Sequence, residues 1–277
     1  MEIMEIIKES FIFPSNDVGK LAIYIVLSVL AGILSISGLG IVIFSLIGNR
    51  LYAIVGIILI ILALAIGFIL SGYGISIIKS GIEHDPDVPG FVWKDNIITG
   101  IKYFILSIVY FIIPAIITLA VAFITNVPGN ISAVTNQYMG SFANVSTAIN
   151  GTLPAVAISN AMISNLVTSL TITGLVAVIL FIIFAFVQIM GECRLAKTDS
   201  LAYALNIPEA FKDIGRIGWG KVIAIIILIF IIISVINIII NLISHYITGI
   251  GIISIIVTPY LTFFASRATG LLYSEIA

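Results

Sequence analysis

The chain has 277 residues, of which 61% are hydrophobic and only 9% are charged, and its mean hydropathy is +1.27. Because a soluble domain carries about 25% charged residues, this composition excludes an ordinary soluble protein and predicts one embedded in a membrane. The net charge of −1 gives no sign of a nucleic-acid partner, and the single cysteine, Cys193, excludes an internal disulfide and a multi-cysteine metal site.

Residues 1–13 alternate charged side chains, including Glu5, Lys8 and Glu9, with isoleucine and phenylalanine. This pattern predicts a short amphipathic helix lying in the cytoplasmic interface of the membrane. Pro14 would end the helix, and the Ser, Asn or Asp at residues 15–17 would cap the element that follows. A frayed tail is the alternative interpretation.

Six apolar stretches follow, and each is long enough to cross the hydrocarbon core of a bilayer as a helix of about 20 residues. They cover residues 21–47, 51–78, 97–124, 166–190, 221–243 and 247–265. We therefore predict an all-α fold, a polytopic membrane helical bundle of six transmembrane helices with short amphipathic interfacial helices. Residues 1–277 would form a single integral membrane domain. Residues 37–40 (Ser-Gly-Leu-Gly) could break the first helix, and Ala63, Gly67 and Ser71 form a small-residue face for helix packing.

Threading these stretches in order places all of the 12 Lys and Arg residues except Arg50 on one side of the membrane. Lys and Arg in short loops remain in the cytoplasm. The sequence therefore predicts a multi-pass protein of the cell membrane with both termini cytoplasmic. Residues 79–96 and 191–220 would be cytoplasmic loops, and residues 125–165 an external loop.

The three long loops differ in character. Residues 79–96 carry the densest charge, with His84 among three acidic neighbours, but the spacing of a metal-binding loop is missing, which favours a solvated loop. Residues 125–165 contain no charged side chain, and an uncharged loop of this length is expected to be either functional or disordered. Within it, Thr152 and Pro154 could mark the start of the fourth helix.

The loop at residues 191–220 contains a second predicted interfacial helix. Asn206, Pro208 and Glu209 make a variant of the capping box, and apolar residues then recur at helical spacing as far as Ile217. We predict a helix over residues 206–217 with Phe211 and Ile214 in apolar surroundings. A helix tucked beneath the bundle to close it is the alternative.

Several short motifs resemble those of a prokaryotic multi-span membrane family known as domain of unknown function 4013. The motifs are Phe13-Pro14-x-x-Asp17, Ser71-Gly72-Tyr73, Pro89 with Trp93-Lys94-Asp95, Glu192-x-Arg194-Leu195-Ala196 with Glu209-Ala210-Phe211, and Pro259-Tyr260 followed by Ala265-x-Arg267-x-x-Gly270-x-x-Tyr273. They are spread over nearly the whole chain. The resemblance implies a multi-span membrane fold, and it implies no established activity and no catalytic residue.

Polar residues inside the spans are the candidates for a functional site, because such positions are usually functional. In the fifth span they recur every three or four residues as one stripe of Ser234, Asn237, Asn241 and His245. The stripe could form interhelical hydrogen bonds or line a path for a solute or lipid headgroup. We predict that Asn237 and Asn241 point into the bundle, because an amide facing hydrocarbon would lack a partner.

A second candidate is a cytoplasmic polar cluster of Gln188, Glu192, Arg194 and Arg267. The expected interaction is an ion pair between Glu192 and either arginine, since ionisable groups at membrane depth usually pair. In the sixth span, Thr258 and Pro259 mark a candidate kink, because proline removes one helical hydrogen bond. The kink could be a gate or a fixed bend.

Three classes of function remain, which we order by how well the sequence suits them. A non-catalytic accessory or organising component of the membrane comes first, and a carrier or channel for a small solute or lipid comes second. A lipid-modifying enzyme comes last, so we expect no enzymatic activity, no cofactor and no metal site. The expected partners are membrane lipids and either other membrane proteins or a second copy of the chain, without nucleic acid.

Overall fold

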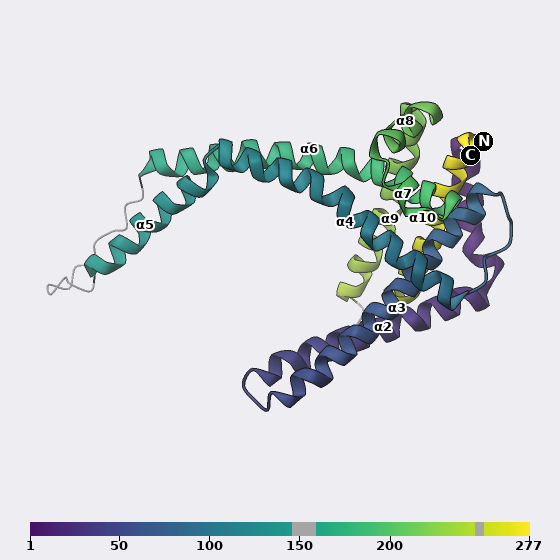
Figure 1. Cartoon of the computed structure of the whole chain (residues 1–277), viewed down its shortest axis with the longest axis horizontal. Coiled ribbons are helices and arrows are strands. Elements are labelled where there is room, and N and C mark those ends of the chain that lie inside the picture. The colour runs from purple at the N-terminus through teal and green to yellow at the C-terminus, as the bar shows by residue number, and fades with distance from the viewer. Residues whose placement is uncertain (146–158, 247–251) are drawn as a thin grey trace. The chain divides into compact units, whose positions relative to one another are not determined.

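The structure, a computed structural model, describes residues 1–145, 159–246 and 252–277 (Figure 1). In these residues every regular element is a helix and no strand occurs. Six helices are long and apolar enough to cross a membrane: α2 (Val18–Ser45), α3 (Leu51–Ile82), α4 (Trp93–Ile124), α6 (Asn160–Thr198), α9 (Trp219–Tyr246) and α10 (Ile253–Tyr273). The prediction of an all-α, six-span membrane protein is confirmed.

The helices begin and end at other residues than the predicted spans, because an apolar stretch marks only the part of a helix that lies in the hydrocarbon core. Helix α6 extends beyond residues 166–190 in both directions, and α3 and α4 continue into the predicted loop at residues 79–96. Helix α2 is continuous through Gly38 and Gly40, so residues 37–40 do not break it. The sixth span is described only from residue 252 onward and runs past the predicted end at 265.

The predicted external loop at residues 125–165 contains a helix that the sequence pattern did not indicate, α5 (Val127–Val145). Asn126 turns the chain with a φ of 59°, and α5 then lies beside α6. The amide of Asn130 donates to the Ser169 hydroxyl over 3.1 Å, and Thr125 and Thr173 join their hydroxyls at 2.9 Å. Uncharged polar residues therefore satisfy one another between helices. Thr152 and Pro154 lie outside the described residues.

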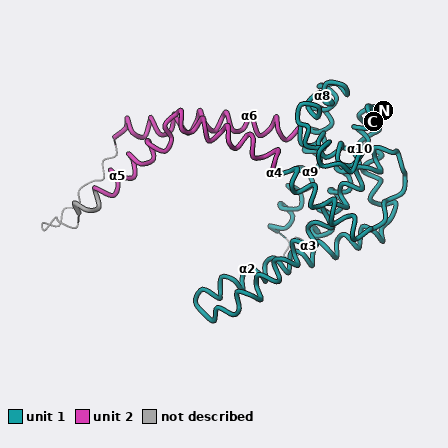
Figure 2. The backbone as a smooth tube through the Cα atoms, viewed as in Figure 1, with its two compact units in different colours: residues 1–107, 187–277 teal, residues 108–186 magenta. Residues whose placement is uncertain are grey.

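The helices group into two compact units, which Figure 2 shows in two colours. The first unit contains residues 1–107 and 187–277, and the second contains residues 108–186. Within the first unit α10 is the central helix and contacts α1 (Ile3–Ile12), α2, α3 and α9. Half of the most apolar stretch of α10 is buried, against at most 17% in the other five spans. The main candidate site therefore belongs to the surroundings of α10.

An aromatic cluster holds the first unit together beside α10. Tyr73 of α3 is fully buried, stacks on Phe91 with ring centroids 3.9 Å apart, and donates its hydroxyl proton to the Pro89 carbonyl over 2.8 Å. Tyr24 of α2 meets Phe263 of α10 edge to face at 5.2 Å. These contacts join two spans, the connection between α3 and α4, and α10 into one core.

Glycines allow several helices to approach to backbone contact. A side chain at Gly72 would overlap the backbone of Asn96, and one at Gly100 would overlap the backbone of Phe68, so α3 and α4 touch at these two points. Gly81 and Gly270 do the same for α3 and α10. Of the predicted small-residue face, Ala63 is buried, whereas Gly67 meets only open space, so no backbone approaches closely there.

Both predicted amphipathic helices are present. Helix α1 buries Ile6 and Ile7 and packs on α10, which rules out a frayed tail. Helix α8 (Ile207–Ile217) is capped by the Asn206 side chain, which accepts from the backbone N–H of Glu209. Ile214 is fully buried, whereas Phe211 is 45% exposed and packs edge to face on Trp219. A four-residue helix, α7 (Leu201–Ala204), precedes α8.

Candidate functional site around helix α10

The polar stripe of the fifth span lies on α9, and its members face different surroundings. Ser234 and Asn237 are half-buried, whereas Asn241 and His245 are exposed. The amide of Asn237 donates to the Ile233 carbonyl over 2.8 Å, and that of Asn241 to the Asn237 carbonyl over 2.9 Å. The prediction that Asn241 points into the bundle is wrong. Its physical premise fails because a carbonyl one turn back in the same helix satisfies the amide.

The predicted cytoplasmic cluster divides into separate interactions. Gln188 donates to Glu192 over 3.0 Å and to the Ser107 hydroxyl over 3.3 Å. Arg194 pairs instead with Asp213 of α8 at 2.8 Å. The expected pairing of Glu192 with Arg194 or Arg267 is wrong. Arg194 is two residues along the same helix and so faces nearly the opposite side, and Arg267 pairs with Glu9. The sequence did not identify Asp213 as a partner of Arg194. The one available sign was that Asp213 is an acidic residue next to Ile214 on the apolar face of the predicted amphipathic helix.

Arg267 of α10 is 1% exposed and joins three segments of the first unit. Its guanidinium donates to the Glu9 carboxylate and to the Asp85 carbonyl, both over 2.6 Å, and to the Ser80 hydroxyl over 3.3 Å. It also lies over the Phe13 ring at 4.5 Å from the centroid. The charged loop at residues 79–96 is therefore tied to α10 by its backbone. The role of Arg267 here is structural.

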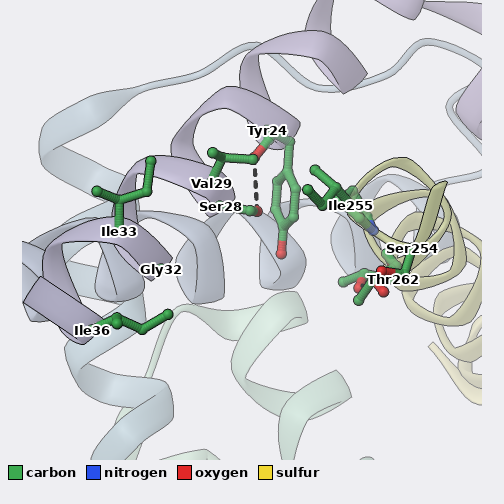
Figure 3. Close-up of a pocket in the computed structure, with 11 residues that line it drawn as sticks. Tyr24, Ser28, Val29, Gly32, Ile33, Ile36, Ser254, Ile255 and Thr262 are labelled. Carbon is green, nitrogen blue, oxygen red and sulfur yellow. Dashed lines mark hydrogen bonds between the residues drawn. The ribbon is translucent and has the colours of Figure 1, made fainter. Parts of the chain in front are cut away.

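A groove of about 500 Å³ lies in the first unit between α2 and α10 (Figure 3). Figure 3 shows the Tyr24 ring between the other α2 side chains and Ser254, Ile255 and Thr262 of α10. The lining is Tyr24, Ser28, Val29, Gly32, Ile33 and Ile36 from α2, with Ser254, Ile255, Thr258, Pro259 and Thr262 from α10. The groove is apolar towards Ile36 and carries hydroxyl groups near Tyr24.

Two smaller pockets adjoin the same stretch of α10. One of about 190 Å³ lies among α2, α3, α4, α6 and α10, and is lined by Glu192 together with Tyr24, Ser71, Tyr103, Thr262 and Ser266 among others. The other, of about 310 Å³, lies between α9 and α10, with Asn237, Thr258, Thr262 and Ser266 in its lining. Thr262 lines all three pockets. We call these three spaces the Thr262 pockets.

The candidate kink lies in the wall of the groove. Helix α10 is helical on both sides of Pro259, from Ile253 to Tyr273. Because proline has no N–H, the Ile255 carbonyl has no helical donor at position 259. Ile255, Thr258 and Pro259 all line the groove. Pro259 therefore interrupts the backbone hydrogen bonds of α10 at residues that line the groove.

The polar groups of the Thr262 pockets are mainly acceptors. Thr262 and Ser28 donate their hydroxyl protons to carbonyls of their own helices, over 2.9 and 2.8 Å, and Asn237 uses its N–H₂ in the same way. The Thr262 hydroxyl also hydrogen-bonds Tyr24, which leaves its oxygen one further lone pair to accept from a ligand. Glu192 accepts from Gln188, and among the described residues no Lys, Arg or His nitrogen lies within 4 Å of its carboxylate. Nor do the described residues contain a group of three or more His, Cys, Asp or Glu that could hold a metal ion.

Comparison with protein families agrees with the motifs that lie between Ser71 and Phe211, whereas the motifs at residues 13–17 and 259–273 lie outside the matched part of the chain. A family model described as a protein of unknown function, DUF4013, matches residues 55–245, which include four of the six spans in whole or in part: α3, α4, α6 and α9. Searches of curated proteins and of solved structures found no match. Since the family model covers well over half of the chain, the chain belongs to the DUF4013 family of multi-span membrane proteins.

Proposed function

We propose that the protein is a non-catalytic membrane protein of the carrier class, which binds an amphipathic solute or a lipid in the Thr262 pockets. The observation that carries this proposal is the convergence of three pockets on one residue of the central helix. Ligand sites are concave, mostly apolar, and supplied with a few convergent polar groups. Among helix bundles they usually lie between helices, as these pockets do.

The orientation we propose has both termini in the cytoplasm. Arg267 joins Glu9 to the loop at Asp85, and the two chain ends, which lie side by side in Figure 1, are joined by the Met1–Glu275 ion pair. Arg50 lies at the other end of the α2–α3 hairpin. This separation supports the charge partition of the sequence. It would set the Tyr24 end of the groove near the cytoplasmic face and the Ile36 end deeper in the bilayer.

The test is to fill the groove and ask whether an amphiphile still reaches it. The probe is a photoreactive dodecanol in phosphatidylcholine vesicles that contain the full chain. We expect cross-links on residues 29–36 and 254–262, and a loss of at least about tenfold in Gly32→Phe. The matched control is Gly40→Phe, because both glycines face open space and only Gly32 lines the groove. Equal labelling of the two variants would contradict the proposal.

An organising role is the second candidate, and the low burial of five spans favours it. These spans leave apolar faces that lipid or another protein must cover. On size-exclusion chromatography in a mild detergent, an organising protein would elute as a complex larger than one chain. That complex would survive Gly32→Phe, whereas a carrier would lose its cross-linking in the same variant.

A further inference from the structure

We propose that the ligand of the Thr262 pockets is an amphipathic amine, with its ammonium group beside Glu192 and its alkyl chain in the groove between α2 and α10. This inference rests on the proposed function, because it names the ligand of the same pockets. Three properties of this ligand, namely its positive charge, its hydrogen-bond donors and its alkyl chain, are each inferred from a separate observation.

The positive charge follows from Glu192. This carboxylate lines the pocket of about 190 Å³ and accepts a hydrogen bond from the Gln188 amide over 3.0 Å. The arginines that sequence analysis expected to neutralise it are engaged elsewhere, Arg194 by Asp213 and Arg267 by Glu9. An acidic group at membrane depth without a cationic partner is costly and marks a functional position. One carboxylate matches a ligand with one positive charge.

The hydrogen-bond donors of the ligand are inferred from the acceptor groups of the protein that surround Glu192. Thr262 donates its proton to the Thr258 carbonyl and also hydrogen-bonds Tyr24, so its oxygen can act towards a ligand only as an acceptor, with one further lone pair. Ser71 and Ser266 line the same pocket. An ammonium group carries three N–H donors and no acceptor, which suits such a wall. The rings of Tyr24 and Tyr103, also in the lining, favour an organic cation because aromatic faces attract ammonium groups.

The alkyl chain follows from the way the small pocket meets the groove. The two spaces share Tyr24 and Thr262, so a molecule seated at Glu192 can continue along α2. From Tyr24 to Ile36 the groove follows α2 for about 18 Å, at 1.5 Å per residue. Its far part is lined by Val29, Ile33 and Ile36. A polar end near the chain termini and an apolar end along the helix fit an amphiphile of the inner leaflet.

The experiment compares photoreactive dodecylamine with photoreactive dodecanol at equal concentration in phosphatidylcholine vesicles. The two probes share the chain and differ in the charged group. In the wild-type chain we expect the amine to label the groove about tenfold more strongly, as a hydrogen-bonded charge pair predicts. Equal labelling by the two probes would overturn the amine inference and leave groove binding intact. Absence of labelling by both would overturn the proposed function as well.

Glu192→Gln tests the residue that carries the inference. The new amide oxygen can still accept from Gln188, so the fold should be retained, and labelling by the alcohol should be unchanged. The preference for the amine should disappear. Glu83→Gln is the matched control, since Glu83 is an exposed acid at the end of α3 and lines none of the Thr262 pockets. A preference that survives Glu192→Gln would overturn the proposed position of the ammonium group.

Competition identifies the source of the amine. An ethanolamine phospholipid and butylamine both present a primary ammonium, the first as a membrane headgroup and the second as a free solute. Displacement of the dodecylamine probe by the phospholipid supports a headgroup, and displacement by butylamine alone supports a free amine. Displacement by neither would overturn the inference.

Discussion

Arg267 shows how one buried cation can position segments that are far apart in the sequence. Its side chain is 2% exposed and reaches Glu9, 258 residues away, as well as the carbonyl of Asp85. The Glu9 carboxylate is 39% exposed, so water screens the ion pair itself. The larger stabilisation therefore comes from the hydrogen bonds to Asp85 and Ser80 and from the contact with the Phe13 ring.

Arg267→Leu should lower the free energy of unfolding by about 3 kcal/mol, because buried oxygen atoms lose their donor. The measurement is denaturant unfolding of the purified protein in detergent micelles. Lys79→Leu is the control, since Lys79 and Glu83 are both more than half exposed, and we expect little change there. A similar loss of stability in the two variants would mean that the buried contacts of Arg267 contribute nothing special.

At the scale of the helices, glycines decide where backbones touch. Gly72 and Gly100 face each other's helices across α3 and α4, whereas Gly74, one residue beyond Tyr73, has only the Ser266 hydroxyl at 3.8 Å. A small-residue spacing in the sequence does not distinguish these cases. The distinction depends on which side of α3 meets its neighbour, and that is a property of the packed helices.

Gly72→Ala should destabilise the protein by more than about 2 kcal/mol, because its methyl group would overlap the Asn96 backbone and force α3 and α4 apart. Gly74→Ala should be neutral or stabilise by up to about 1 kcal/mol through helix propensity. Thermal unfolding of both variants in the same detergent is the measurement. Equal midpoints for the two variants would show that α3 and α4 do not meet at Gly72.

At the scale of the whole molecule, hydropathy predicted the six spans and amphipathic spacing predicted α1 and α8. These features depend on local composition, which a single sequence contains. The pairing of Glu192 and Arg194 was predicted wrongly because ion-pair choice depends on which helix faces meet. Helix α5 was missed because its uncharged Asn, Ser and Thr residues resemble a loop until α6 supplies partners such as Ser169. The Thr262 pockets likewise depend on packing and leave no mark in the sequence.

The charge partition predicts a topology that can be tested on intact cells. Gly140→Cys in α5 should react with a membrane-impermeant maleimide without permeabilisation, whereas Glu83→Cys should react only after it. Cys193 is buried and should stay silent in both variants. Labelling of position 140 only after membrane disruption would contradict the six-span orientation.

The central position of α10 has a consequence for how the chain is made. Synthesis proceeds from the N-terminus at about 5–20 residues per second, so the helix that α1, α2, α3 and α9 all contact leaves the ribosome after them. Until then Glu9 has no arginine partner, and the wall of Tyr24 and Tyr73 has no Phe263 to pack against. Until α10 is inserted, the earlier spans are in the bilayer without the helix that covers these surfaces. A ribosome that stalls before residue 253 would therefore release five inserted helices without their common contact, in the form that membrane quality control recognises.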